Sequence, residues 1–495
     1  MNLAFFTLLV ALATSSMFAE VSKEDWSQWR GPSLNGSSRA RNLPALLDPS
    51  SLSWTAPLPG KAGSTPIVSG DRVFGTSPDD QKNLLLLCLD RKSGRELWRQ
   101  TVGVGDKEVG RNNMCAPSPI TDGQRVYTLF GTGDFAAFDL DGKPLWNRNI
   151  GKDFGSFAVM WIFGSSPLLH EDRLYLQVLQ RDEMPPDYPR FDGKSKRDSF
   201  LLCLDAKTLA PSPLCGFSVP ALFSTKTAFT YRSCNAMKCP PDYPRFDGKS
   251  KRDSFLLCLD AKSGKDLWRH IRKTDSTKES SESYATPISF QGPNGWELVV
   301  VGGDYLSGHK FSDGSELWRA HLYEKRDDWY RIVTSPLIAA GRILASGPKG
   351  QPVVAFRGGG KGDVTTSHRD WEFRAAPTDW STPCVLDGAL FVLDGQKRRI
   401  TRVNPETGDP VWSGKIPGAG PIWGSLSGGE GKLYCHDENG TVNALSAGDK
   451  FEVLSSHFFV GEAPCKGSIA LANGQILVRT AKALHAFGQV KPVAK

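Results

Sequence analysis

The side chains that could do chemistry gather in one sequence context, a few residues before a repeated Ser/Thr-Pro or similar dipeptide. Aromatic rings occur there with amide and basic groups, a mixture that suits a sugar, a planar cofactor or a peptide. The candidate ligand-binding residues are Asn112, Asn113, Trp161, Tyr284, Tyr330, Arg331, Trp380, Trp423 and Lys466, with Trp329 and Asp379 beside them. The competing interpretation is that these rings pack between structural repeats.

Other kinds of reactive site are not indicated by the spacing of the residues. The eight His are scattered without a metal-binding spacing, and the ten Cys include neither Cys-x-x-Cys nor an adjacent pair. The glycine-rich run around Lys361 lacks the Gly-Lys-Ser/Thr of a phosphate loop. Asp90, Asp139 and Asp260 fall in turns, where a carboxylate accepts backbone hydrogen bonds. The sequence therefore predicts no catalytic residue and no metal ligand.

The segment Leu87–Trp98 recurs along the chain and organises it. In five copies a Gly stands four residues before a Trp, which predicts a strand, a tight turn with φ > 0 at Gly, and a second strand that ends on a large ring. These rings are expected to dock one repeat onto the next rather than to contact a cofactor. The expected docking residues are Trp54, Trp98, Trp146, Trp268, Trp318 and Trp412. Cys88, Cys203 and Cys258 share one strand position and are interpreted as small buried hydrophobes.

The repeats predict an all-β fold, an eight-bladed β-propeller of four-stranded antiparallel blades over residues 53–489. Small polar residues open eight units, and the following residues are numbered 66, 119, 167, 287, 336, 383, 426 and 469. The last unit has only three strand-like segments before the chain ends. The N-terminal strand Ser53–Ala56, which carries Trp54, is expected to complete it and close the ring.

One interval between openings is far longer than the others, and it contains a repeat that is identical letter for letter. Residues 185–207 reappear as residues 240–262, an offset of 55. Identity over 23 residues cannot reflect a fold constraint, because the other repeats share only a few positions. Residues 185–239 are therefore interpreted as a tandem duplication or a gene-model artefact that is looped out of the propeller.

The leader-like start of the chain predicts an exported protein, and its mild charge argues against nucleic-acid binding. Residues 1–19 have the apolar run and small residues of a signal peptide, 20–52 form a lead segment, and 490–495 a tail. The net charge of +7 is mild and no long basic run is present, so nucleic-acid binding is not expected. No later run has transmembrane length. We expect a periplasmic or secreted protein, soluble and monomeric.

Two motifs resemble a known family. Asp90-x-x-Ser93-Gly94-x-x-x-Trp98 is similar to the tryptophan-docking repeat of pyrroloquinoline-quinone (PQQ)-type propellers, and residues 26–32, Trp-x-x-Trp-Arg-Gly-Pro, resemble the start of exported bacterial proteins with PQQ-like repeats. Such repeats occur in quinoprotein alcohol dehydrogenases and in the non-catalytic scaffold subunit of the outer-membrane barrel assembly machinery. The dehydrogenases add a catalytic Asp, calcium ligands and often a disulfide of adjacent Cys, none of which maps onto a motif here.

The resemblance leaves three functions to compare. The expected function is a non-catalytic binding or assembly scaffold that holds a protein partner or small ligand at the propeller mouth, with no cofactor. The first alternative is a dehydrogenase of alcohols or sugars that uses PQQ with calcium. The second is a carbohydrate-binding module.

Overall fold

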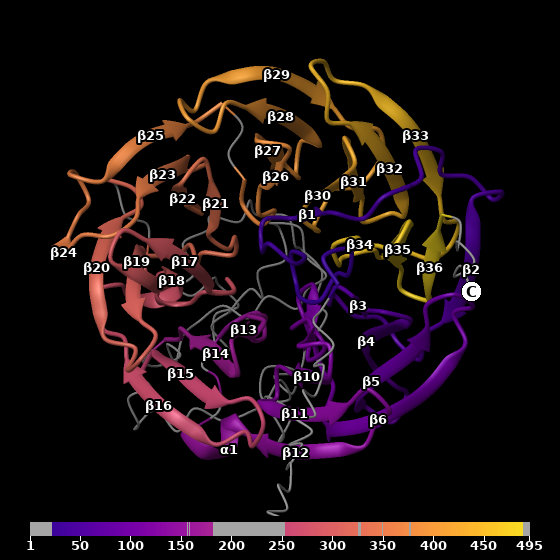
Figure 1. The fold of residues 1–495 in the computed structure, drawn as a ribbon, viewed down its shortest axis with the longest axis horizontal. Coiled ribbons are helices and arrows are strands. Elements are labelled where there is room, and N and C mark those ends of the chain that lie inside the picture. Colours follow the sequence, from indigo (N-terminus) through magenta and orange to yellow (C-terminus); the bar gives the residue numbers. More distant parts are fainter. Residues whose placement is uncertain are drawn as a thin grey trace, which may run out of the picture.

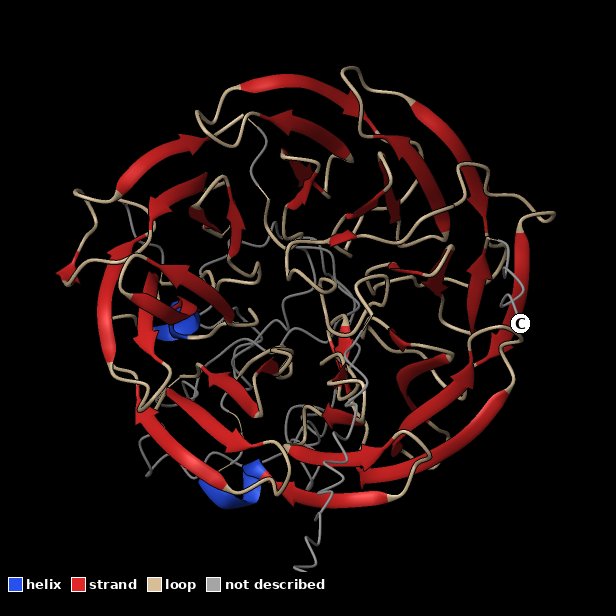
Figure 2. Ribbon diagram, in the orientation of Figure 1, coloured by secondary structure: helices blue, strands red, loops and turns tan. Residues whose placement is uncertain are grey.

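Eight antiparallel sheets stand around a central axis like the blades of a propeller (Figure 1). The computed structural model describes residues 22–155, 157, 159–181, 253–324, 328–348, 350–375 and 378–488. Within these residues, helix is confined to α1 (Ile150–Phe154) and a 3-10 turn at Lys278–Ser281 (Figure 2). The predicted eight-bladed all-β propeller is confirmed.

Each blade runs from the axis outward in chain order. Blade 1 contains β3 (Ile67–Ser69), β4 (Arg72–Pro78), β5 (Asn83–Asp90) and β6 (Glu96–Val104). Blade 2 contains β9 (Ile120–Thr121), β10 (Arg125–Leu129), β11 (Asp134–Asp139) and β12 (Pro144–Asn149). Blade 3 contains β13 (Leu168–His170), β14 (Arg173–Val178), β15 (Phe255–Asp260) and β16 (Asp266–Ile271). Blade 4 contains β17 (Ile288–Gly292), β18 (Gly295–Gly302), β19 (Tyr305–Lys310) and β20 (Glu316–His321).

The second half follows the same plan. Blade 5 contains β21 (Leu337–Ala339), β22 (Arg342–Ser346), β23 (Val353–Arg357) and β25 (Arg369–Phe373). Blade 6 contains β26 (Cys384–Leu386), β27 (Ala389–Asp394), β28 (Arg399–Val403) and β29 (Pro410–Lys415). Blade 7 contains β30 (Ser427–Gly429), β31 (Lys432–His436), β32 (Thr441–Ser446) and β33 (Val453–Phe458). Two-residue strands extend two sheets: β1 (Ser37–Ser38) on β30 and β24 (Gly362–Asp363) on β20.

Blade 8 joins the two ends of the chain. It contains β34 (Ala470–Ala472), β35 (Gln475–Arg479), β36 (Ala483–Phe487) and, as its outermost strand, the N-terminal β2 (Leu52–Pro57). Strand β2 pairs antiparallel with β36, and Trp54 lies opposite Ala486. The predicted closure by the N-terminal strand is confirmed. Ring closure pairs the chain's ends and removes the free edges that a linear array of blades would leave.

Blade 3 takes its third strand from the second of the two identical copies. Strand β14 pairs with β15, and β15 belongs to residues 240–262. Residues 185–239, which were interpreted as an inserted duplication, lie outside the described residues. That interpretation stays a prediction.

Each docking tryptophan contacts the glycine turn of the next blade. Gly94 has φ +71°, and a Cβ there would lie 2.5 Å from Cε3 of Trp54. The same glycine thus meets two requirements, a left-handed turn and room for the preceding blade's ring. The indole Nε1 of Trp54 donates to Arg91 O at 2.8 Å. Trp98, Trp146, Trp268 and Trp412 make the equivalent bond to Leu140, Ala261, Phe311 and Gly448.

Three blade joints differ from the expected pattern. Trp318 was expected to dock onto the next blade, but it is fully buried and its Nε1 donates to Glu297 of its own blade at 2.7 Å. At the joint between blades 5 and 6, where no Trp was expected, Trp371 docks: its Nε1 donates to Pro405 O at 3.1 Å and its ring covers Gly408. At the outer strand of blade 7, Ser455 bonds to the lead segment at Ala45 and Leu47 instead.

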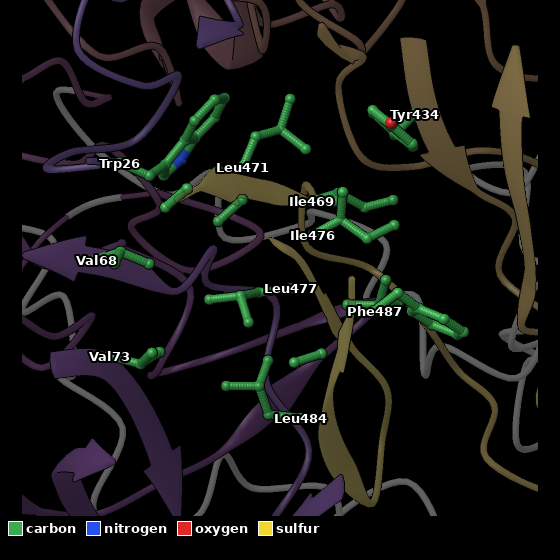
Figure 3. Close-up of a cluster of buried hydrophobic side chains, with 14 of the residues drawn as sticks. Trp26, Val68, Val73, Tyr434, Ile469, Leu471, Ile476, Leu477, Leu484 and Phe487 are labelled. Carbon is green, nitrogen blue, oxygen red and sulfur yellow. The ribbon is translucent and has the colours of Figure 1, made fainter. Parts of the chain in front are cut away.

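The core consists of apolar clusters between neighbouring blades. The cluster in Figure 3 joins blades 7, 8 and 1, and it contains Trp26 of the lead segment beside Val68 and Leu471. Burial of one such side chain contributes about 1.5–3 kcal/mol. The six Cys within the described residues are free and buried, and burial raises the pKa of the Cys88 thiol to about 12. These thiols are packing groups rather than nucleophiles.

Candidate ligand-binding site at the channel mouth

A cavity of about 450 Å³ opens where the loops that precede the innermost strands converge. Rings, basic groups and small hydroxyl residues from most of the blades line it. The lining residues are Trp29, Gly63, Thr65, Gly110, Arg111, Asn112, Ala116, Ser118, Trp161, Gly164, Ser166, Tyr284, Thr286, Arg331, Val333, Trp380, Trp423, Gly424, Ser425, Lys466 and Ser468.

The structure brings seven of the nine candidate residues into this lining: Asn112, Trp161, Tyr284, Arg331, Trp380, Trp423 and Lys466. The other two are placed elsewhere. Asn113 is buried beside the cavity, where its amide donates to Lys61 O at 2.7 Å. Tyr330 is half-buried and does not line the cavity. Whether any of these residues binds a ligand stays a prediction.

A closed ring of eight hydrogen bonds surrounds the axis at the depth of the cavity. In each blade, the backbone N–H of the opening Ser or Thr donates to the hydroxyl oxygen of the equivalent residue in the next blade, at 2.8–3.1 Å. We call these eight residues the hydroxyl ring: Thr65, Ser118, Ser166, Thr286, Ser335, Thr382, Ser425 and Ser468. The small polar residue that opens each unit was recognised in the sequence only as a marker of blade starts.

The hydroxyl hydrogens of the ring are available to donate hydrogen bonds to a ligand. Within the described residues, none of the eight hydroxyl groups donates a hydrogen bond to the protein. A hydroxyl that accepts one bond still carries one donor. Six of the eight residues line the cavity, so its inner end presents donors to an acceptor group.

The lead segment closes the channel at the end opposite the mouth. Figure 1 shows this indigo chain crossing the middle of the ring, where β1 pairs with β30. Its backbone bonds to the innermost strands of four blades, at Val68, Thr121, Val385 and Gly428. We call residues 25–38 the plug. Trp29 of the plug forms part of the cavity wall.

Arg30 fastens the plug between blades 6 and 7. Its guanidinium is buried and donates to the carbonyl oxygens of Pro383 and Leu426. Burial lowers the pKa of Arg30 to about 10. The motif Trp-x-x-Trp-Arg-Gly-Pro therefore has a structural meaning that the sequence did not reveal: Trp26 enters the core, Trp29 faces the cavity and Arg30 bridges two blades.

The cavity is basic. Arg111, Arg331 and Lys466 line it, and none of the described lining residues is Asp or Glu. Burial lowers the pKa of Arg111 against the opposing effect of Glu438. Burial also lowers the pKa of Lys466, against the opposing effects of Glu108 and Glu438. Both shifts show that positive charge here is poorly solvated and incompletely compensated.

The aromatic rings of the wall already have partners. The rings of Trp380 and Trp423 lie 4.2 Å apart, and the guanidinium carbon of Arg111 is 3.8 Å from the Trp423 centroid. The Trp161 ring lies close against Gly110, where a Cβ would approach it to 2.7 Å. Ring faces covered in this way have less area left to stack on a ligand.

An ionic network supports the wall from behind. The ring N–H of Trp161 donates to Glu279 at 3.1 Å, and the Tyr284 hydroxyl donates to Glu282 at 2.8 Å. Arg331 pairs with Glu279 at 3.3 Å, while buried Arg181 contacts Glu282. Burial raises the pKa of Glu282 to about 7, against the opposing effect of Arg181. The network fixes the orientation of the two rings that face the cavity.

The sequence matches one protein family over more than half of its length. The matching family is described as outer membrane protein assembly factor BamB, and the matched residues are 39–177 and 249–413. The chain belongs to the BamB family. Its propeller is thus of the PQQ-like type that the repeat motifs indicated. A comparison with curated protein sequences gives no match.

Solved structures show the same fold at low sequence identity to this BamB-family chain. A europium-containing methanol dehydrogenase has a TM-score of 0.62 at 10% identity, covering 94% of this chain and 98% of its own. Quinohemoprotein alcohol dehydrogenase ADHIIG from Pseudomonas putida HK5 gives 0.58 at 10%, covering 96% and 82%. BamB from Moraxella catarrhalis gives 0.51 at 11%, covering 89% and 98%. Identities this low establish the shared fold and do not separate scaffold from enzyme.

The cavity of this BamB-family propeller fits one component of a PQQ–calcium site and not the other. Arg111, Arg331 and Lys466 could pair with the carboxylates of the quinone. Calcium binds through oxygen ligands, carboxylates foremost, and the described lining offers no carboxylate. In the described part of the chain, no three His, Cys, Asp or Glu side chains come together to hold a metal ion.

Among the residues that the structure describes, no helix is both long and apolar enough to cross a membrane. Residues 1–19, expected to be a signal peptide, lie outside the described residues.

Proposed function

We propose that this chain is an exported, non-catalytic binding scaffold that holds its ligand in the mouth cavity. The observation that carries the proposal is the cavity itself: converging loops and Trp29 of the plug form a walled site of about 450 Å³. A volume in this range suits one small molecule or the end of a partner's peptide segment. Export follows from the leader-like residues 1–19, and a protein partner is consistent with the family's description as an assembly factor.

A variant that fills the cavity tests the proposal. Gly63 lines the cavity with ordinary backbone geometry, and a Cβ there meets nothing closer than 3.9 Å. Gly63→Phe should therefore fold normally and occupy the site. We expect ligands identified by thermal-shift screening of the purified protein to quench tryptophan fluorescence in the wild type and to lose binding in Gly63→Phe. Ligands that bind both proteins equally would place the site elsewhere.

A quinone-dependent dehydrogenase is the second candidate, because the basic side chains of the cavity suit the carboxylates of PQQ. Titration with PQQ, with and without Ca²⁺, followed by a dye-linked dehydrogenase assay on alcohols and sugars, separates the two. Saturable quenching together with turnover would establish the enzyme. Quenching without turnover would fit a binding scaffold.

A carbohydrate-binding module is less well supported. Neutral sugars are commonly held on exposed aromatic faces, whereas Trp423 and Trp161 are already covered by Trp380, Arg111 and Gly110.

A further inference from the structure

We infer that the ligand of the mouth cavity is an organic anion, and that Arg111, Lys466 and the hydroxyl ring bind it directly without a metal ion. This inference rests on the proposed function, since it names the ligand class of the same site. The shared chemistry is an oxyanion group, either carboxylate or phosphate. Three observations carry it.

The first observation is unmatched positive charge. In the part of the chain that the structure describes, neither Arg111 nor Lys466 makes an ion pair within 4.0 Å, although other surface Lys and Arg residues do. Lys466 Nζ bonds instead to the carbonyl oxygen of Arg111. Arg111 and Lys466 interact with Glu438, and Lys466 also with Glu108, but only beyond 4.0 Å. An anion that enters the cavity would offset the cost of this partly desolvated positive charge.

The second observation is the set of free donors at the inner end of the cavity. Thr65 and Ser468 accept backbone N–H bonds through their hydroxyl oxygens, and each keeps a proton with no acceptor among the described residues. The side-chain amide of Asn112, also in the lining, donates one N–H to Trp161 O at 3.3 Å and has a second N–H. An oxyanion has several acceptor lone pairs and no donor, so it complements a wall of donors.

The third observation is the lack of metal ligands. A divalent cation is usually held by carboxylate oxygens, and the described lining has basic groups and no Asp or Glu. Arg111 and Lys466 would repel such a cation. In this cavity the basic side chains themselves supply the positive charge that a metal ion would otherwise bring to an anionic ligand.

Matched pairs of charged and neutral probes test the inference. Benzene-1,3,5-tricarboxylate is compared with its triamide, and glucose 6-phosphate with glucose, by calorimetry and tryptophan fluorescence in EDTA. We expect at least one charged probe to bind at least tenfold more tightly than its neutral partner, and 1 mM CaCl2 in place of EDTA to change nothing. The two pairs also distinguish carboxylate from phosphate as the preferred group.

Substitutions test whether Arg111 and Lys466 are the side chains that bind the anion. Arg111→Gln and Lys466→Gln should each weaken the charged probe about tenfold, while Arg111→Lys keeps part of the affinity. Arg95→Gln, an exposed residue of an outer turn, should bind like the wild type. Circular-dichroism melting confirms that each variant is folded.

The outcomes separate this inference from the proposed function. Equal affinity within each pair, a requirement for calcium, or indifference to both Gln variants would refute anion recognition. If a neutral probe binds and Gly63→Phe abolishes that binding, the mouth remains the ligand site although the ligand class is wrong. If no probe binds, the anion inference is overturned, and the cavity-filling experiment decides the proposed function separately.

Discussion

The backbone N–H of Ser468 donates to the hydroxyl oxygen of Thr65 at 3.1 Å, although 403 residues separate them in the chain. This bond closes the hydroxyl ring between blade 8 and blade 1. Strand β2 closes the outer edge of blade 8 by pairing with β36. Both residues are buried, so the N–H needs a partner other than water. The first and last blades are thus joined both near the axis, by the hydroxyl ring, and at the outer edge, by β2.

Removing one hydroxyl of the ring should destabilise the fold. Ser118→Ala leaves the buried N–H of Thr65, which donates to Ser118 Oγ at 2.9 Å, without an acceptor. The expected loss is about 1–3 kcal/mol in the free energy of unfolding, measured by urea denaturation. Ser118→Thr is the control, since Thr occupies the ring in three other blades. Equal stability of wild type and Ser118→Ala would show that the ring contributes nothing.

The repeated opening residues predicted the number of blades but not the ring they form. A small hydroxyl residue before a strand is compatible with many local roles, such as turn capping. The hydrogen bond to the next blade forms only when eight blades are arranged at a fixed angle. No single repeat encodes that arrangement. At the mouth, Asn112 and Lys466 were predicted from their positions before strands, whereas Trp29 was missed because it lies in the lead segment, outside the repeats. Arg111 precedes Asn112 directly, so the same positional signal could have found it.

The docking glycines should be more sensitive to substitution than other left-handed glycines. Gly142→Ala puts a Cβ 2.7 Å from the Trp98 ring at φ +87°, whereas Gly431→Ala, at φ +68°, meets nothing within 4 Å. Both changes carry the backbone cost of about 1 kcal/mol that left-handed geometry imposes on Ala. Only Gly142→Ala also displaces the indole ring of Trp98, so it should lower the free energy of unfolding by about 1–3 kcal/mol more than Gly431→Ala does. Thermal unfolding compares the pair, and equal losses would contradict the docking role.

The same geometry explains where the sequence-based assignment of docking residues was wrong. Five of the six predicted docking residues have a glycine four residues earlier in their own repeat, but the glycine that a ring needs lies in the next blade. Trp371 has no such glycine before it and was missed, although Gly408 receives its ring. Trp318 has one in its own repeat and was included, yet the blade that follows has a long loop there, and β24 from this loop pairs with β20.

Arg30 should hold the plug in place. Arg30→Ala removes two bonds to buried carbonyl oxygens between blades 6 and 7, and hydrogen bonds to charged groups contribute about 1.5–3 kcal/mol each. Part of this is offset because the buried guanidinium is costly to desolvate, so we expect a net loss of about 1–3 kcal/mol. Hydrogen exchange should show faster exchange over residues 25–38. Exposed Arg39→Ala is the control, and unchanged exchange in Arg30→Ala would rule out the fastening role.

Buried His309 should make the fold sensitive to mild acid. Its Nδ1–H donates to Gly314 O at 2.9 Å, and its Nε2 lies 2.9 Å from the Ser307 hydroxyl, which also accepts from Arg272. The Ser307 proton has two acceptors in reach, His309 Nε2 at 2.9 Å and Val300 O at 3.5 Å. The shorter contact favours the imidazole, which accepts the proton only when it is neutral. Burial, reinforced by the charge of Arg272, lowers the pKa of His309 to about 3.

The direction of the pH effect follows from proton uptake by the unfolded chain. Below pH 6.5, His309 becomes protonated in the unfolded chain, whereas in the folded protein it stays neutral down to about pH 3. The contribution of His309 to the free energy of unfolding is therefore full above pH 6.5 and is lost as the pH falls. Glu282, whose pKa is raised to about 7, acts in the opposite direction. Comparison with His309→Gln isolates the histidine. The wild type's advantage in unfolding free energy should shrink by about 1 kcal/mol per pH unit between pH 6 and 4.5, and a constant difference would mean that His309 is not buried in its neutral form.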